Sequence, residues 1–240
     1  MRAGAVIALC WASVALAYRP FDQTDADVAE EHEFELEFGP AQALASKDFV
    51  ALTPNFVLNF GIGPRLELVF DGASQIALGA LRNDAARWGF DSELLLKGLL
   101  RRGSLQQEHG PSVAMEGGIV MPQLPAPGGL GAQLALIVSQ RWSVGTLHLN
   151  VFGERTREGG YEIVAGAIAE GPAEWTVRPV AEAYADALVK GSTVASILGG
   201  AIWRVSDGLA LDGALRIVPA RTPRFELRLG FTWSISDKPE

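Results

Sequence analysis

Apolar and polar residues alternate along most of the chain. From 225 to 235 the sequence reads FELRLGFTWSI, in which aromatic or aliphatic residues hold every second position and charged or small residues lie between them. Because successive side chains of a β-strand point to opposite faces, this period predicts a strand with one wholly apolar face. HEFELEF, at 32 to 38, has the same period and places three glutamates on its second face. Strands are therefore predicted near both ends of the chain.

Similar alternation predicts more strands between these two. They lie at 56–62, 66–70, 90–100, 111–121, 130–140, 144–152, 161–171, 174–185, 193–204 and 209–217. The total is about twelve strands with a typical length near ten residues, as transmembrane strands require. We therefore predict an all-β fold, a transmembrane up-and-down antiparallel β-barrel of about twelve strands.

The predicted connections alternate between tight and long. Tight turns are predicted at 63–65, 141–143, 171–173 and 206–208, and longer loops at 71–87, 121–129, 153–160 and 218–224. Outer-membrane barrels have short turns on the periplasmic side and long loops outside, so both termini are expected in the periplasm. One connection, 101–110, falls on the short side by parity but is about as long as the loops.

The two faces of the predicted strands differ in the way that a lipid-facing barrel requires. The outward set is apolar, and it comprises Leu134, Leu136, Val138, Leu147, Leu149, Val151, Leu211, Leu215 and Ile217. The predicted lumen-lining set is polar or charged, and it comprises Glu33, Glu35, Glu37, Glu67, Lys97, Glu116, His148, Asn150, Arg178, Glu182, Arg204, Asp212, Arg216, Glu226 and Arg228. A water-soluble barrel would reverse the two sets. Five tryptophans near strand ends, Trp88, Trp142, Trp175, Trp203 and Trp233, fit the aromatic girdles of membrane barrels.

Composition and the first residues indicate export. The chain is 48% hydrophobic, but after the first twenty residues it has no apolar run long enough for a spanning helix, which excludes helical membrane proteins. Residues 1–17 combine one arginine, an apolar run and a small-x-small site, and they predict a signal peptide cleaved after Ala17. Cys10, the only cysteine, lies in this segment, so disulfides and thiolate chemistry are not expected in the mature chain.

The predicted division of the chain has four parts. Residues 1–17 are the signal peptide, 18–31 an acidic lead-in, 32–236 the outer-membrane β-barrel and 237–240 a periplasmic tail. The lead-in lies in the periplasm or, alternatively, inside the lumen as a plug. Loss of Arg2, the only charged residue of the signal peptide, changes the formal charge from −8 to −9. Nucleic acid is a poor partner for such a surface.

Several stretches resemble a known family. RPFDQTDADVAEEHEFELEFGP (19–40), HGPSVAMEGGIVMP (109–122), GAQLALIVSQRWSVGTLHLN (131–150), IAEGPAEWTVRPVAEAY (168–184) and LGGAIWRVSDGLALDGALR (198–216) resemble the outer-membrane β-barrel proteins grouped as the MetA-pathway phenol-degradation, or transporter-like, family. The resemblance covers most of the mature chain. It implies a barrel in a Gram-negative-type outer membrane and uptake of aromatic or other hydrophobic compounds.

Candidate catalytic and metal-binding groups are few. HGPS places Ser112 close to His109, but a turn before a strand explains that stretch more simply. DQTDAD, at 22–27, lacks the glycine and terminal glutamate of a calcium loop. His148 is expected to be a hydrogen-bonded wall residue beside Asn150, with a proton-sensing or catalytic role as the less favoured alternative. We therefore expect no enzyme, no catalytic residue, no metal and no cofactor.

Barrel closure is expected to bring charged residues from the two ends of the chain together. Pairing of the first strand with the last would set the 33, 35 and 37 glutamates next to Glu226 and Arg228, with Arg216 one strand further on. Three carboxylates on one face repel one another unless cations or water compensate. This seam would be either a salt-bridge network or a selectivity element.

The predicted function is a narrow passage across the outer membrane for small, hydrophobic or aromatic solutes. Small residues at inward positions, among them Ala114, Ala135 and Ala214, favour a slender lumen. A closed barrel with a structural or docking role is one alternative, and a secreted soluble ligand-binding barrel is another. The expected partners are outer-membrane lipid, the barrel-assembly machinery and a small-molecule solute.

Overall fold

The computed structural model describes residues 19–45, 50–78, 88–125, 128–189, 191–219 and 224–236. The predicted signal peptide, its cleavage site, Cys10 and the tail at 237–240 lie outside these residues. In this part of the chain, helical structure is limited to one 3-10 turn, η1 (Ser104–Gln106). No helix among the described residues is long and apolar enough to cross a bilayer, a finding that has no bearing on strands.

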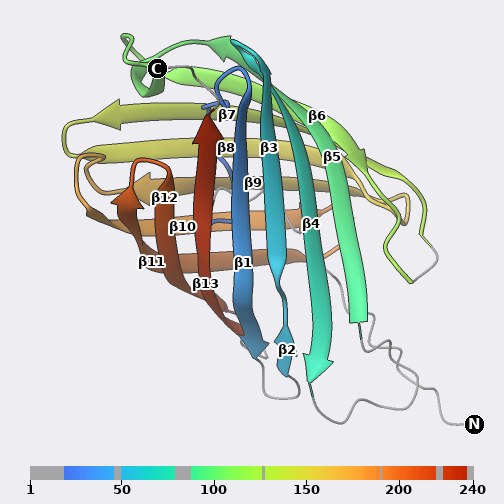
Figure 1. Ribbon diagram of the computed structural model, residues 1–240. Coiled ribbons are helices and arrows are strands. Elements are labelled where there is room, and N and C mark those ends of the chain that lie inside the picture. Colours follow the sequence, from blue (N-terminus) through green and yellow to red (C-terminus); the bar gives the residue numbers. More distant parts are fainter. Residues whose placement is uncertain are drawn as a thin grey trace, which may run out of the picture.

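Twelve antiparallel strands close into a barrel (Figure 1). In chain order they are β1 (Glu33–Ala45), β3 (Asn55–Gly63), β4 (Leu66–Leu78), β5 (Trp88–Arg101), β6 (Ser112–Val120), β7 (Gly131–Trp142), β8 (Gly145–Arg155), β9 (Tyr161–Glu170), β10 (Val177–Leu188), β11 (Thr193–Ser206), β12 (Leu209–Val218) and β13 (Arg224–Ser236). Each strand pairs with its neighbours, and β13 pairs with β1. The predicted fold class is confirmed.

A further strand, β2 (Val50–Leu52), is not part of the ring of twelve. It pairs with both β1 and β4, and Thr53 and Pro54 separate it from β3. A proline has no N–H to give to a ladder, so the chain breaks its pairing at this point. The partner strand β1 is irregular nearby, because its register against β13 shifts between Phe38 and Ala41.

One end of the barrel is built from tight turns. Two-residue connections at 64–65, 143–144 and 207–208 lie at this end, together with the start of β1 and the end of β13. We call it the short-turn end and the opposite one the long-loop end. The connection between β5 and β6, residues 102–111, is the long one at the short-turn end, and it contains η1.

The outer surface of the barrel is apolar. Every member of the predicted outward set is exposed or half-buried, with Leu134 58% exposed and Leu149 47% exposed. The five girdle tryptophans are also exposed, Trp175 from the connection between β9 and β10 and the others from strands. Charged side chains instead turn inward, Glu182 and Arg228 being 2% and 5% exposed. This is the arrangement of a barrel whose outer face meets lipid.

The predicted pairing of the first strand with the last is confirmed, but the neighbours predicted for Glu33, Glu35 and Glu37 are wrong. Glu35 pairs with Ser234 and Glu37 with Thr232, whereas Arg228 pairs with Gln42. The reason is strand direction. The start of β1 and the end of β13 both lie at the short-turn end of the barrel. The antiparallel ladder therefore joins these two, and the start of β13 lies near the long-loop end.

The closing strand offers a test of the two faces. Leu229, 46% exposed at mid-strand, points outward, whereas Thr232 lines a cavity inside the barrel. Leu229→Arg is expected to destabilise the barrel in lipid by about 2 to 4 kcal/mol, because it places a charge near mid-bilayer. Thr232→Arg is expected to cost less. Folding into lipid vesicles, followed by denaturant titration, measures both, and equal losses would show that the faces are assigned wrongly.

Candidate functional site

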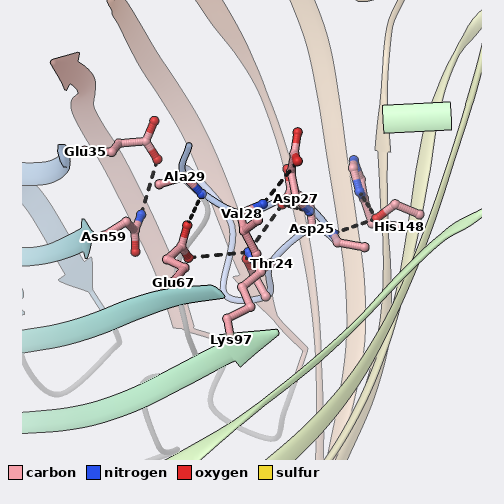
Figure 2. Close-up of polar contacts among 12 residues, drawn as sticks. Thr24, Asp25, Asp27, Val28, Ala29, Glu35, Asn59, Glu67, Lys97 and His148 are labelled. Atoms are coloured by element: carbon pink, nitrogen blue, oxygen red, sulfur yellow. Dashed lines mark hydrogen bonds and ion pairs between the residues drawn. The ribbon is translucent and has the colours of Figure 1, made fainter. Parts of the chain in front are cut away.

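The acidic lead-in runs through the inside of the barrel. We use this name for its described part, residues 19–31. Arg19, Phe21 and Ala26 are 3%, 1% and 0% exposed. Phe21 packs in one apolar cluster with residues of β9 to β12, and Ala26 packs in another with residues of β6 to β9. Figure 2 shows the segment from Thr24 to Ala29 between wall side chains. The segment leaves the lumen at the short-turn end, where β1 begins.

Side chains of the wall bind the main chain of the lead-in. Near its start, the Glu37 carboxylate accepts a hydrogen bond from Arg19 N (2.8 Å), and Glu182 accepts from the backbone N–H groups of Asp22 and Gln23 (3.0 to 3.1 Å). The lead-in forms no strand ladder, so these wall groups satisfy backbone donors that would otherwise be buried without partners.

The same pattern continues toward the short-turn end. Asn150 Nδ2 donates to Thr24 O (2.8 Å), Ser139 Oγ accepts from Ala26 N (2.9 Å), and the Glu67 carboxylate accepts from Ala29 N. These bonds come from β8, β7 and β4, which lie in different parts of the ring. The lead-in is therefore held across the width of the lumen and not along one wall.

Arg19 anchors the beginning of the lead-in. Its Nε and NH2 atoms each lie 3.0 Å from a carboxylate oxygen of Asp212, and its NH1 donates to Asn55 Oδ1 at 2.8 Å. A two-pronged guanidinium–carboxylate contact is among the stronger polar contacts in proteins. A Cβ at Gly39 or Gly230 would come within 2.0 or 2.3 Å of the guanidinium, so only glycine leaves room for it at both positions.

A second anchor is an alternating charge network around Asp22. Its carboxylate lies 2.6 Å from Arg228 NH2 and 3.3 Å from Arg216 Nε. Glu226 lies 3.2 Å from each of the same two guanidinium groups. The side chains of Asp22, Glu226 and Arg228 are buried, and that of Arg216 is 12% exposed. Removing one partner from a buried ion pair leaves an uncompensated charge that is costly.

Lys97 forms the third anchor. Its Nζ lies 3.5 Å from Asp25 Oδ1, 3.8 Å from Glu67 Oε1 and 3.3 Å from Thr24 Oγ1 (Figure 2). Further along, Gln106 Nε2 of η1 donates to Asp27 Oδ1 at 2.8 Å. Burial and the charge of Asp25 raise the pKa of Asp27 above its usual value, so docking of the lead-in opposes ionisation of this carboxylate.

Ser139, His148 and Glu170 form a hydrogen-bonded chain across β7, β8 and β9. Ser139 Oγ lies 2.8 Å from His148 Nδ1, and His148 Nε2 lies 3.0 Å from Glu170 Oε1. The residue types and distances are those of a nucleophile, a base and an orienting acid. The serine is completely buried, however, and its oxygen also accepts the Ala26 N–H. With the lead-in docked, the three side chains form a hydrogen-bonded part of the wall that contacts the lead-in through Ser139.

The lead-in divides the short-turn end of the lumen. A cavity of about 780 Å³ lies between it and the β1 to β6 side, and Glu33, Glu35, Asn59 and Glu67 line part of this space. A smaller cavity, of about 190 Å³, lies on the β9 to β13 side, and Arg178 and Arg204 belong to its lining. The barrel therefore contains space for small solutes on both sides of the segment.

The predicted lumen-lining residues do not all lie equally deep. The structure buries Glu37, Glu67, Lys97, Glu116, His148, Asn150, Glu182, Asp212, Glu226 and Arg228. It leaves Glu33, Glu35, Arg178 and Arg216 half-buried and Arg204 exposed at the short-turn mouth. The contacts of the lead-in bring Glu37, Asn150, Glu182, Asp212 and Arg228 into one site.

Sequence reasoning missed several functional side chains. Arg19 lies in a segment without periodicity, so no pattern indicated its place in the lumen. Asn55, Ser139 and Glu170 lie at inward positions of their strands, and alternation alone would have placed them there.

Comparisons with known proteins identify the fold. No protein-family model matches the chain, and neither does any curated protein. Among solved structures, the COG4313 outer membrane channel from Pseudomonas putida F1 matches with a TM-score of 0.61 at 10% identity, covering 87% of this chain and 97% of that one. A KdgM porin matches with a TM-score of 0.59 at 8% identity, covering 84% and 99%. Identities this low show the fold alone, which is that of outer-membrane channel barrels.

The charge network makes a prediction about the lead-in. Asp22→Asn removes the lead-in charge that pairs with Arg216 and Arg228. It is expected to loosen the segment, because the two guanidinium groups then share one carboxylate, Glu226. The measurement is the rate at which maleimide labels a cysteine introduced at Ala26 in a Cys10→Ala background. This rate is expected to be higher when Asp22 is replaced by Asn.

Asp207→Asn is the matched control, because Asp207 is exposed in a tight turn and its change should leave the labelling rate unaltered. Equal labelling rates in the Asp22→Asn and control proteins would contradict a role for the network in holding the lead-in.

Proposed function

We propose that the protein is an outer-membrane channel for small solutes and that its lead-in occludes the passage. The observation that carries the proposal is that the middle of a twelve-strand lumen is filled by a separate segment. Eight strands leave an interior filled by wall side chains, and sixteen to eighteen leave an open channel. Twelve strands lie between these two cases, and the inward side chains of Ala114, Ala135 and Ala214 take up little of the lumen. The apolar outer face and the channel fold support the same assignment.

The lumen favours polar solutes over apolar ones. Membership of the phenol-degradation family, to which the chain has a resemblance, would imply hydrophobic or aromatic solutes. The described walls of both cavities instead carry Glu33, Glu35, Arg178 and Arg204. Transfer of an apolar solute past such groups gains little from burial and displaces water from charges. We therefore propose that the solutes are small and polar. Aromatic solutes are also included in the flux experiment below.

A closed barrel is the alternative function. The ion pairs of Arg19, Asp22 and Asp25 with the wall favour it, because they tie the lead-in to strands far away in the sequence. In a closed barrel this segment would be a permanent part of the core. In a channel it is displaced, so removal of the segment is expected to have different effects on a closed barrel and on a channel.

Solute flux into liposomes separates the two functions. The intact protein is expected to pass small solutes slowly, and a protein lacking residues 18–31 is expected to pass them faster, because the cavities then join into one lumen. Neutral, charged and aromatic solutes of similar size are compared with protein-free vesicles. If neither protein passes any of them above that background, the transport proposal fails.

Membrane location has its own test. The protein is expected to fractionate with outer membranes, and an unboiled sample should migrate differently from a boiled one on a denaturing gel, because folded barrels resist detergent. Recovery from the periplasm in soluble form without detergent would favour the secreted ligand-binding barrel.

A further inference from the structure

The wall groups that hold the lead-in recognise its main chain. Besides the bonds that Glu182, Asn150 and Ser139 make to lead-in backbone groups, Arg228 NH1 donates to Pro20 O at 2.8 Å. Backbone N–H and C=O groups recur in every peptide chain, so these contacts do not depend on the side chains of the lead-in. The interior of the barrel therefore contains a binding site for a peptide, which the lead-in fills.

Asp22 shows what kind of residue the site selects. Its carboxylate lies 2.6 Å from Arg228 NH2, and its backbone N–H donates to Glu182 at 3.1 Å. The N–H of Gln23 donates to the same Glu182 carboxylate at 3.0 Å. A ligand at this point must therefore carry a carboxylate next to two consecutive N–H donors. An aspartyl residue inside a peptide has both.

Departure of the lead-in would leave these wall groups without matching partners. Among the described residues, Glu182 receives hydrogen bonds only from the lead-in backbone, and it is 2% exposed. Arg216 and Arg228 would at the same time share the one carboxylate of Glu226. Water that enters a vacated site brings no negative charge to two guanidinium groups. A peptide with a carboxylate in the same place restores both sets of contacts.

A second carboxylate is recognised three residues further on. Lys97 Nζ lies 3.5 Å from Asp25 Oδ1, and Lys97 is 5% exposed. Between the two aspartates, Asn150 Nδ2 binds the carbonyl oxygen of Thr24 at 2.8 Å. The wall thus pairs with carboxylates at the first and fourth positions of the stretch 22–25 and with the backbone between them.

Gln23, which lies between the two aspartates, is poorly matched to the site. It is 2% exposed, and neither Oε1 nor Nε2 has a hydrogen-bond partner within the described chain. Its amide lies over Gly166, where a Cβ would come within 2.6 Å of both atoms. A buried amide without partners costs free energy, which an apolar side chain of similar length avoids. The lead-in is therefore not the best peptide for its own site, and a better-matched peptide is expected to compete with it.

We propose that this lumen site binds short acidic peptides with two carboxylates three residues apart, and that the lead-in occupies it as a tethered competitor. The inference rests on the proposed passage and names its solute class. An entering peptide replaces the contacts of Asp22 and Asp25, so the wall charges stay paired while the lead-in moves aside. Because the attraction is partly electrostatic, it weakens as ionic strength rises.

Titration calorimetry tests the site with a tetrapeptide that has the sequence of residues 22–25, DQTD, and is blocked at both ends. The protein is full-length Asp22→Asn in detergent, in which the tethered competitor is weakened and the wall is unaltered. Saturable binding is expected. It should be about ten-fold tighter than binding to the unchanged protein, because a tethered segment competes at high effective concentration. Heat-modifiable migration on a gel checks that each protein is folded.

Three related ligands show which groups are recognised. DMTD, in which a thioether replaces the unpaired amide, should bind more tightly than DQTD. NQTN keeps the backbone but has no carboxylate, and suberate has two carboxylates but no amide group. Each of these two should bind about ten-fold more weakly than DQTD, because each loses one of the two sets of charge-assisted contacts.

The wall is tested by Arg216→Gln in the Asp22→Asn protein. This change should weaken DQTD binding about ten-fold, because it removes one of the two guanidinium partners of the peptide. Arg155→Gln in the same protein is the matched control, because Arg155 is exposed and its described hydrogen bond goes to Leu130 O at 3.1 Å. The DQTD affinity of the control should be unchanged.

The inference is overturned if DQTD does not bind, if NQTN or suberate binds as tightly, or if DMTD binds less tightly. It is also overturned if Arg155→Gln weakens binding as much as Arg216→Gln. Calorimetry needs no flux, so DQTD binding without flux into liposomes would fail the passage alone. Flux of other solutes without DQTD binding would fail this site alone.

Discussion

Charged side chains that point into a narrow lumen must find partners within it, because lipid lies on the other side of the wall and bulk water is restricted. The rest of the structure depends on this constraint. Arg19, Asp22 and Asp25 each meet wall groups of opposite charge, on β12, on β12 and β13, and on β5. The lead-in is thus the complement of the wall, and its acidic composition suits the arginines and the lysine that it meets.

The alternation of the sequence predicted the barrel because a period of two is a local property of the chain. Each strand needs only its own residues to show which side faces lipid, so Leu134 and Leu149 on the outside, and Glu182 and Arg228 on the inside, were assigned correctly. The interruption at Pro54 was not predicted. It depends on a ladder with β1 and β4 that the segment alone does not reveal.

The contacts within the lumen could not be predicted in the same way. Asp22 and Arg228 are separated by 206 residues, and Arg19 and Asp212 by 193, so no periodicity connects them. The neighbours of Glu35 at the seam were predicted wrongly for a related reason, because alternation gives the face on which Glu35 lies but not its height in the barrel. Ser139 was overlooked since a hydroxyl beside aliphatic neighbours carries no signal until His148 is paired with it.

The path of the lead-in also has a consequence for the order of assembly. It belongs to the first part of the chain, but its anchors Asp212, Arg216 and Arg228 lie on β12 and β13, the last strands to be made. Those side chains face a common interior only after β13 has paired with β1. Contacts of such long range form late. The newly closed barrel would therefore pass through a stage with an empty lumen, and filling of the lumen would mark the completion of folding.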